Sequence, residues 1–241
     1  MGSSKREREY ARKRHERWLE HQAAARARRR RLLVIAASVV GVLVLGGAVA
    51  LALQTTGGSQ EADGTTPSTA PDPALAEDRA WEVDLTTTAG DLALELDGAA
   101  APQAVASFVT LAQAGYFDDT TCHRLTVEGI YVLQCGDPTA TGSGGPDYTF
   151  GPVENAPADD VYPAGTVAMA RLGNDGSSMG SQFFLVYADS TIPSDNAGGY
   201  TVFGEVTEGM DVLRSVAEAG IAEGSQQTPA TEVTIEGVET Q

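Results

Sequence analysis

Residues 81–97 read WEVDLTTTAGDLALELD. Apolar and polar side chains alternate over 81–87 and again over 91–97, and Ala89-Gly90 between them is a turn signal. Such alternation is typical of a half-buried strand, and two such strands joined by a short turn form a β-hairpin. The segment therefore predicts a β-hairpin that opens a mainly β domain.

Further strand patterns and two helix patterns follow the hairpin. Residues 101–115, APQAVASFVTLAQAG, place apolar side chains on one helical face, with Pro102 near the start and Gly115 at the end. Residues 209–219 predict a second helix. Strands are predicted at 120–126, 131–135, 165–169, 182–187, 200–206 and 232–239. Many strands with two isolated helices indicate a closed β-barrel with helices at its ends.

Charge divides the chain into two parts. Residues 1–31 carry twelve Lys or Arg against four acids, a net charge of +8. Residues 32–241 carry four Arg and no Lys against twenty-nine acids, a net charge of −25. The overall composition, 42% hydrophobic and 20% charged, excludes a disordered polyelectrolyte and a collagen-like repeat. The division indicates two environments rather than one domain.

An uncharged run of twenty-two residues, LLVIAASVVGVLVLGGAVALAL at 32–53, separates the two parts. As a helix with a rise of about 1.5 Å per residue it spans roughly 33 Å, enough for the hydrocarbon core of a bilayer. A cleavable signal peptide is the alternative, since AVA at 48–50 and ALA at 50–52 match small-residue cleavage patterns. The length of the run and the long segment before it favour an uncleaved transmembrane helix.

Basic residues flank only one end of this run. Five arginines lie within 26–31, whereas 54–63 holds no basic residue. The positive-inside rule therefore predicts a single-pass protein of the cell membrane, with a cytoplasmic N-terminus and an extracytoplasmic C-terminal domain. We expect the basic cytoplasmic segment 1–31 to contact anionic membrane lipids rather than nucleic acid. Residues 54–80, rich in Gly, Ser, Thr, Pro and Ala, predict a flexible linker.

Few residues of the domain at 81–241 suit covalent chemistry. His123 is its only histidine, so no histidine cluster is available to bind a metal. Ser181 does not lie in a nucleophile-elbow pattern, which argues against a Ser-His-Asp triad. The Gly-rich run 136–146 contains no Lys and leads into no helix pattern, which argues against a phosphate-binding loop. We expect neither a metal nor a cofactor.

Arg124 is one of only four arginines after residue 31, and it lies inside an apolar strand pattern. A buried arginine needs a partner or a function. Gln134 on the next predicted strand and Gln182, followed by Phe183 and Phe184, are candidate neighbours. Together they would form a groove for an uncharged ligand with one fixed cation. A structural arginine held by backbone carbonyls is the alternative, and the residues alone do not decide between the two.

Five motifs follow one another along 81–241: CHR at 122–124, QCGDP at 134–138, VAMAR at 167–171, GSQFF at 180–184 and VFGEV at 202–206. Together they resemble the motifs of the cyclophilins, which are peptidyl-prolyl cis-trans isomerases. The resemblance implies a closed antiparallel eight-stranded barrel capped by two helices, with a proline-binding groove on its outer face. It also implies that the partners are proline-containing segments of unfolded or folding proteins.

The resemblance further implies roles for single residues. Arg124 matches the catalytic arginine, which would stabilise the twisted X–Pro amide. The matches along the peptide groove and the proline pocket are Tyr131, Val132, Gln134, Ala170, Arg171, Gln182, Phe184 and Tyr200. Arg171 is matched to a position that holds the peptide through main-chain groups. A non-catalytic module that binds proline peptides at the membrane is the alternative function.

The sequence departs from the family pattern at four places. Cys122 replaces a Phe, the connection from Arg124 to Gln134 is about two residues longer, and no Trp occurs around 191–199. Tyr200 stands where the family usually has His. The missing Trp puts cyclosporin binding in doubt.

Cys122 and Cys135 are the two cysteines of the chain. On the oxidising side of a membrane they would be free to form a disulfide. Strict alternation opposes this, because Cys122 would share a sheet face with Arg124, and Cys135 would lie on the opposite face from Gln134. A β-bulge would remove the conflict, and both interpretations stay open at this point.

Overall fold

The structure is a computed structural model that describes residues 67–241. The predicted basic segment 1–31, the predicted transmembrane helix 32–53 and the first half of the predicted linker lie outside the described residues. Within 67–241, no helix has both the length and the apolar character needed to cross a bilayer.

The predicted hairpin is present and lies near the middle of the sheet. It consists of β1 (Ala80–Thr87) and β2 (Leu92–Asp97), which pair antiparallel with Trp81 opposite Leu96. Every second residue of β1 is buried, because one face of the strand packs on the core and the other faces solvent. The period-2 pattern therefore correctly predicts which face of the hairpin is buried.

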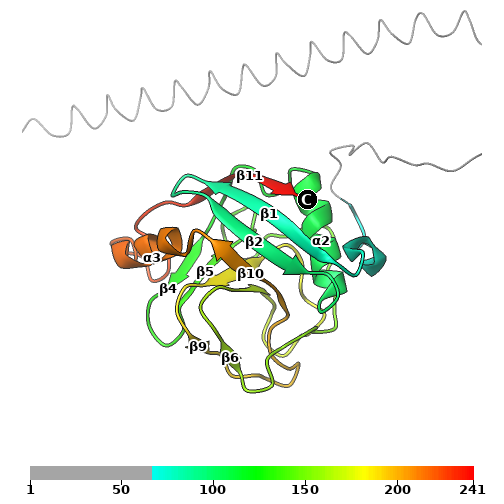
Figure 1. The fold of residues 1–241 in the computed structure, drawn as a ribbon. Coiled ribbons are helices and arrows are strands. Elements are labelled where there is room, and N and C mark those ends of the chain that lie inside the picture. Colours follow the sequence, from blue (N-terminus) through cyan, green and yellow to red (C-terminus); the bar gives the residue numbers. More distant parts are fainter. Residues whose placement is uncertain (1–66) are drawn as a thin grey trace, which may run out of the picture. The chain divides into compact units, whose positions relative to one another are not determined.

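The other strands extend the hairpin into one curled antiparallel sheet. They are β3 (Thr120–Thr121), β4 (Arg124–Thr126), β5 (Val132–Cys135), β7 (Thr166–Met169), β8 (Phe183–Val186), β10 (Val202–Glu208) and β11 (Thr234–Thr240). The hydrogen-bonded order is β3-β11-β1-β2-β10-β7-β8-β5-β4. A separate small pair, β6 (Val161–Tyr162) and β9 (Ser190–Thr191), lies away from the hairpin, below the sheet in Figure 1.

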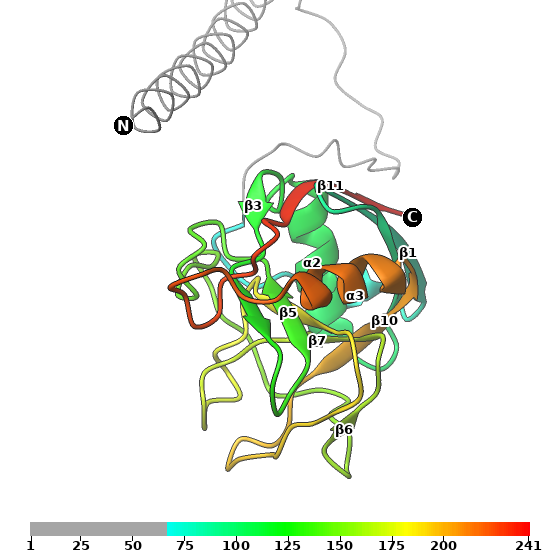
Figure 2. The ribbon, with the colours of Figure 1, turned by 90° about the vertical axis from the view of Figure 1, so that its left-hand side faces the viewer.

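The prediction of a closed eight-stranded barrel is wrong. Among the described residues the sheet has nine strands, and its edge strands β3 and β4 do not pair with each other. These two strands are halves of the predicted strand 120–126, separated by Cys122 and His123. Each half has its own partner, β11 for β3 and β5 for β4. The sheet therefore curls until its two edge strands, β3 and β4, follow one another along the chain (Figures 1 and 2). These two strands do not pair, so the barrel stays open.

Both predicted α-helices are confirmed, and they lie on opposite sides of the curled sheet (Figures 1 and 2). Helix α2 (Pro102–Gln113) begins at a proline, whose fixed φ suits the first helical turn. The carboxylate of Glu154 accepts hydrogen bonds from the Gln103 and Ala104 amides at 3.1 and 3.0 Å and so caps this helix from a distant loop. Helix α3 (Met210–Ala219) buries only Leu213 and Val216.

The folded domain begins before residue 81. A short 3₁₀ helix, η1 (Pro73–Ala76), lies within the segment that we predicted as linker, and its Ala76 is fully buried. The indole Nε1 of Trp81 donates to the Ala76 carbonyl oxygen at 2.9 Å. Residues that we assigned to the linker therefore pack against the Trp81 side chain and belong to the folded domain.

Candidate functional site

Alternate residues of β5 and β8 face two separate hydrophobic clusters. Phe183 and Leu185 belong to the main core, whereas Phe184 and Val186 belong to a second group on the other face of the sheet. We call this second group the outer cluster. Its buried members are Val132, Tyr162, Ala168, Phe184, Val186 and Ile192, with Ile130, Ala170, Tyr200 and Val202 partly buried at its border. The same strands thus stabilise the fold with one face and build a site with the other.

Four of the predicted pocket residues meet in the outer cluster. These are Val132, Ala170, Phe184 and Tyr200. The rings of Phe184 and Tyr200 meet edge to face, with 5.5 Å between their centroids. The structure therefore brings together residues from four separate parts of the sequence in one apolar cluster.

Tyr131 does not join them. It packs against the main core, and its ring centroid lies 5.8 Å from that of Tyr187. Ile130, one residue earlier, packs against the outer cluster instead. Both residues precede β5, so their contacts, rather than strand alternation, assign Ile130 to the outer cluster and Tyr131 to the main core.

A chain of hydrogen bonds connects the three predicted polar residues. Arg124 lies opposite Gln134 in the β4–β5 ladder, and its Nη1 donates to Gln134 Oε1 at 3.0 Å. Gln134 Nε2 donates to Gln182 Oε1 at 2.8 Å. Gln182 Nε2 in turn donates to the carbonyl oxygen of Gly144 at 2.8 Å. The Gly144 carbonyl, which the sequence analysis did not single out, is therefore the far end of the chain.

Only one orientation of the two amides satisfies all three hydrogen bonds. A guanidinium can only donate and a carbonyl oxygen can only accept, so both ends of the chain are fixed. Gln134 must turn its oxygen to Arg124, and Gln182 must turn its nitrogen to Gly144. The chain thus gives Arg124 a defined partner and a defined direction.

Arg124 keeps its positive charge free of a direct carboxylate partner. Within residues 67–241 the ion pairs are Arg79 with Glu77 and Arg171 with Asp195. Arg124 is half-buried at the edge of the sheet, and the neutral Gln134 is its side-chain partner. A charge held in this way remains available to a ligand.

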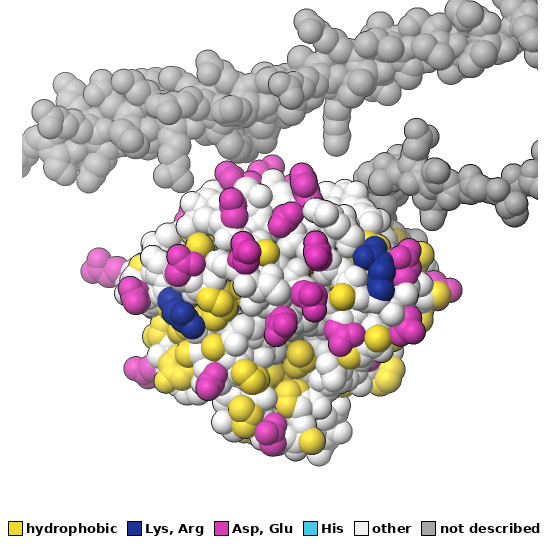
Figure 3. All heavy atoms as spheres, viewed as in Figure 1, with side chains coloured by type: hydrophobic (Ala, Val, Ile, Leu, Met, Phe, Trp, Pro, Cys, Tyr) yellow, Lys and Arg dark blue, Asp and Glu magenta, His cyan; other side chains and the backbone are white. Residues whose placement is uncertain are grey.

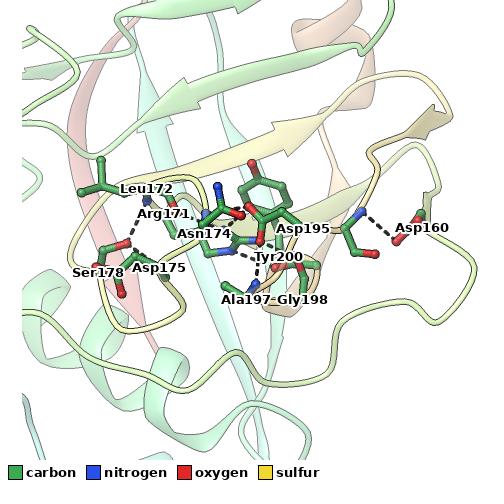
Figure 4. A network of polar contacts seen from close by, with 12 residues as sticks. Asp160, Arg171, Leu172, Asn174, Asp175, Ser178, Asp195, Ala197, Gly198 and Tyr200 are labelled. Carbon is green, nitrogen blue, oxygen red and sulfur yellow. Dashed lines mark hydrogen bonds and ion pairs between the residues drawn. The ribbon is translucent and has the colours of Figure 1, made fainter.

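Arg171 is the arginine that backbone carbonyls hold. Its guanidinium is fully buried and donates five hydrogen bonds (Figure 4). Two of them form a bidentate pair with the Asp195 carboxylate, at 3.0 and 2.9 Å. The other three go to the carbonyl oxygens of Leu172, Gly198 and Gly199, at 3.0, 2.6 and 2.9 Å. The structural role that we left open for Arg124 therefore belongs to Arg171.

Asp195 connects two loops through this ion pair. Its Oδ2 also accepts from the Asn174 amide and its Oδ1 from the Ala197 amide, both at 2.8 Å (Figure 4). Hydrogen bonds from Arg171 and Asn174 hold the pKa of Asp195 far below its usual value. The ionised carboxylate thus joins the loop after β7 to the loop before β10.

The disulfide interpretation of the two cysteines holds in the structure. Cys122 and Cys135 are joined, with 4.0 Å between their Cα atoms. The alternation that argued against this pairing does not apply, because Cys122 lies in the break between β3 and β4 rather than in a strand. The disulfide therefore joins the chain on the two sides of the segment 124–134, which begins at Arg124 and ends at Gln134.

His123 is buried beside this disulfide. Only 6% of it is exposed, and neither ring nitrogen has a hydrogen-bond partner among the described residues. Burial lowers its pKa, and the nearby Asp137 only partly offsets this. His123 is therefore a neutral core residue rather than a catalytic base.

A groove of about 300 Å³ opens beside the hydrogen-bonded chain. Gln134 and Gln182 form one side of it, and the glycine-rich residues 142–146 form another. Ala170 and the strongly exposed Leu172 lie along the same groove. An extended peptide lying here would have its backbone beside two oriented amides.

Comparison with known proteins agrees with this geometry. The family model described as cyclophilin type peptidyl-prolyl cis-trans isomerase/CLD matches residues 82–240. The probable peptidyl-prolyl cis-trans isomerase B of Mycobacterium tuberculosis is 45% identical over 169 residues, which cover 65% of this chain and 53% of the relative. The corresponding protein of Mycobacterium leprae is 44% identical over 167 residues, covering 64% and 55%. The chain thus spans about half the length of these curated relatives.

Solved structures give the same result. The crystal structure of a cyclophilin type peptidyl-prolyl cis-trans isomerase from Cryptosporidium parvum matches with a TM-score of 0.58 at 28% identity. The match covers 68% of this chain and 98% of that one. A second structure of that protein, in the presence of the dipeptide Ala-Pro, matches with a TM-score of 0.57 at 29% identity, covering 66% and 98%. The chain therefore belongs to the cyclophilin-type peptidyl-prolyl cis-trans isomerase family.

Proposed function

We propose that this protein is a peptidyl-prolyl cis-trans isomerase that accelerates rotation about X–Pro bonds in extracytoplasmic proteins. The observation that carries the proposal is the oriented Arg124 guanidinium beside an apolar cluster that contains Phe184 and Val132. The outer cluster would receive the proline ring, while Arg124 would act on the amide. The names of the relatives support the same activity.

The reaction suits a site of this kind. Rotation of an X–Pro amide has a barrier near 20 kcal/mol, because resonance gives the C–N bond partial double-bond character. A rate of about 10³ per second would require a barrier lower by roughly 7 kcal/mol. No bond is made or broken, so the reaction needs neither a nucleophile nor a leaving-group acid.

Arg124 would stabilise the twisted amide more than the planar one. As the C–N bond twists, the proline nitrogen becomes pyramidal and regains a lone pair that can accept a hydrogen bond. A guanidinium N–H directed at that nitrogen interacts more strongly with the transition state than with either planar isomer. Arginine suits this role because it stays charged and keeps its fork geometry. Gln134 would hold it in place.

The decisive test is exchange NMR on a short X–Pro peptide with the full chain and its Arg124→Ala variant. We expect rapid cis-trans exchange that collapses in the variant. Arg214→Ala is the matched control, because it removes an exposed arginine of α3 and should leave exchange unchanged. Slow exchange with the unmodified protein, while peptide shifts still move on titration, would instead identify a non-catalytic proline-binding module.

We also propose that residues 32–53 anchor the domain in the cell membrane, with 1–31 in the cytoplasm against anionic lipids. The uncharged run and the one-sided arginines support this orientation. We expect the protein to stay with membranes after carbonate extraction and its C-terminal domain to be digested by protease added outside spheroplasts. Release of a shortened, soluble chain would identify a cleaved signal peptide instead.

The acidic surface is expected to influence substrate choice. Acidic side chains spread over the face that contains β1 and β2, including the exposed Glu82, Asp84 and Glu95 (Figure 3). Like charges repel at long range, and salt screens that repulsion over about 10 Å at 0.1 M. We expect a modest preference against acidic peptides that weakens as the salt concentration rises.

A further inference from the structure

We propose that Asp137 is a positioning residue for this reaction, because its buried carboxylate fixes the loop 137–144 and with it the Gly144 carbonyl that orients Gln182, Gln134 and Arg124. The proposal rests on the proposed role of Arg124. It concerns a residue that has no contact with the apolar pocket and acts through the hydrogen-bonded chain alone.

The Asp137 carboxylate is the centre of its loop. The residue is fully buried, and four donors surround its two oxygens. Oδ1 accepts from the amide and the hydroxyl of Thr139, both at 2.7 Å. Oδ2 accepts from the amides of Gly142 and Gly144, at 2.6 and 3.0 Å. A buried carboxylate tolerates loss of water only when its lone pairs are satisfied in this way.

The carboxylate is ionised under all ordinary conditions. Burial alone would raise its pKa, but the hydrogen bonds from Thr139, Gly144 and Gly142 outweigh burial and lower the pKa to about 2. Hydrogen bonds to an ionised acceptor are roughly twice as strong as neutral ones. The loop is therefore held by charge-assisted contacts at both ends.

Gly144 couples this loop to the site. Its amide donates to Asp137, and its carbonyl oxygen accepts from Gln182. A Cβ atom at Gly144 would overlap the Asp137 carboxylate and lie 2.7 Å from Thr139 Oγ1. Only glycine therefore fits this close approach, which places the carboxylate against the N–H of one residue and Gln182 against the C=O of the same residue.

Loss of the carboxylate would act on Arg124 through the amides. If the Gly144 carbonyl moves, Gln182 Nε2 loses its acceptor and the chain loses its anchor on the loop. Arg124 still fixes which way each amide points, but the chain is then held at one end only, so the side chains of Gln182, Gln134 and Arg124 can shift together. Displacements of about 1 Å in a positioned group can reduce a rate on the order of a hundredfold.

The test compares Asp137→Asn with Asp97→Asn in the full chain. In Asp137→Asn one acceptor oxygen becomes an NH₂ group. This group faces N–H or O–H donors of the loop and cannot accept hydrogen bonds from them. Asp97 is the matched control, because its Oδ1 accepts from the Ala99 and Ala100 amides at 3.1 and 2.9 Å, away from the chain of amides. For Asp137→Asn we expect kcat to fall on the order of ten- to a hundredfold, while KM changes less than about twofold. Asp97→Asn should change neither.

A second readout does not depend on turnover. The side-chain amide ¹⁵N–¹H signals of Gln134 and Gln182 should shift and broaden in Asp137→Asn but not in Asp97→Asn. Thr139→Val, which removes one of the four donors and keeps the loop sequence otherwise intact, should give a smaller change of the same kind. It serves in place of Asp137→Asn if that variant does not fold.

Two results would overturn the proposal. One is unchanged amide signals and unchanged kcat in a folded Asp137→Asn or Thr139→Val protein. The other is an equal loss of activity in Asp97→Asn, which would indicate a general effect of stability. If the amide signals shift as expected but Arg124→Ala keeps full activity, the positioning holds and the proposed mechanism at Arg124 fails.

Discussion

The guanidinium of Arg171 lies over the ring of Tyr200, with 4.7 Å between its Cζ atom and the ring centroid. The same ring meets Phe184 edge-on in the outer cluster. The Arg171–Asp195 ion pair and the outer cluster are thus joined through one aromatic side chain, which packs between a cation and a phenylalanine. The sequence analysis matched Arg171 to a position that acts through main-chain groups, and so did not predict this contact of its side chain with Tyr200.

Arg171→Ala should destabilise the protein and also reduce the proposed isomerase activity. Removal of the buried guanidinium leaves the Asp195 carboxylate and three carbonyl oxygens without their donor, so the free energy of unfolding should fall. Urea unfolding of the full chain would measure this loss. Arg214→Ala should change the free energy of unfolding by less than about 0.5 kcal/mol, and equal losses in the two variants would contradict the assignment.

Ile130→Ala and Tyr131→Ala should have different consequences. Ile130 borders the outer cluster, so its truncation should weaken peptide binding and raise KM with little loss of stability. Tyr131 packs on the main core, so its truncation should lower stability by about 2 kcal/mol and leave KM nearly unchanged. Peptide titration and urea unfolding distinguish the two effects, and a raised KM in Tyr131→Ala alone would restore the sequence-based assignment.

Loss of the disulfide should cost stability. Replacement of both Cys122 and Cys135 by Ala frees a loop with a sequence separation of 13 residues. In the chain-entropy model a closed loop of this size contributes about 3 kcal/mol. We expect the urea midpoint to fall in the double variant and in the reduced parent protein by similar amounts. If a reductant lowers the urea midpoint of the parent protein and of the double variant equally, the result would argue against the disulfide.

Acid should weaken the fold through His123. Its pKa is lowered in the folded state, so below pH 6.5 the unfolded chain binds a proton that the folded chain does not. Stability from this group is therefore complete above pH 6.5 and is lost as the pH falls toward the folded-state pKa, at up to about 1.4 kcal/mol per pH unit. His123→Phe should abolish this part of the slope in urea unfolding at different pH values. An unchanged slope would show that other groups cause it.

Sequence patterns correctly predicted those elements of the fold that are defined by neighbouring residues. Alternation at 81–97 and the Pro and Gly at the ends of 101–115 correspond to real elements, because the interactions that define them are close in sequence. The break at Cys122 and His123 depends on which distant strands pair with each half of 120–126. No local rule contains that information.

The candidate site likewise has a part that the sequence motifs predicted and a part that they did not. Arg124, Gln134 and Gln182 are brought together as their motifs predict. The role of Gly144 depends on the path of a loop, and that of Arg171 on carbonyls that a later loop supplies. Both roles depend on the positions of backbone carbonyl oxygens, which cannot be read from the identities of the side chains.

The division of β8 between two clusters limits how the site can evolve. A substitution at Phe184 or Val186 alters the outer cluster while Phe183 and Leu185 keep their places in the main core. Insertion or deletion of one residue in β8 would exchange the two sets and damage folding and binding together. We therefore expect specificity to drift by point substitution within the strands, while changes of length are accepted only in the connections, such as the one between β4 and β5.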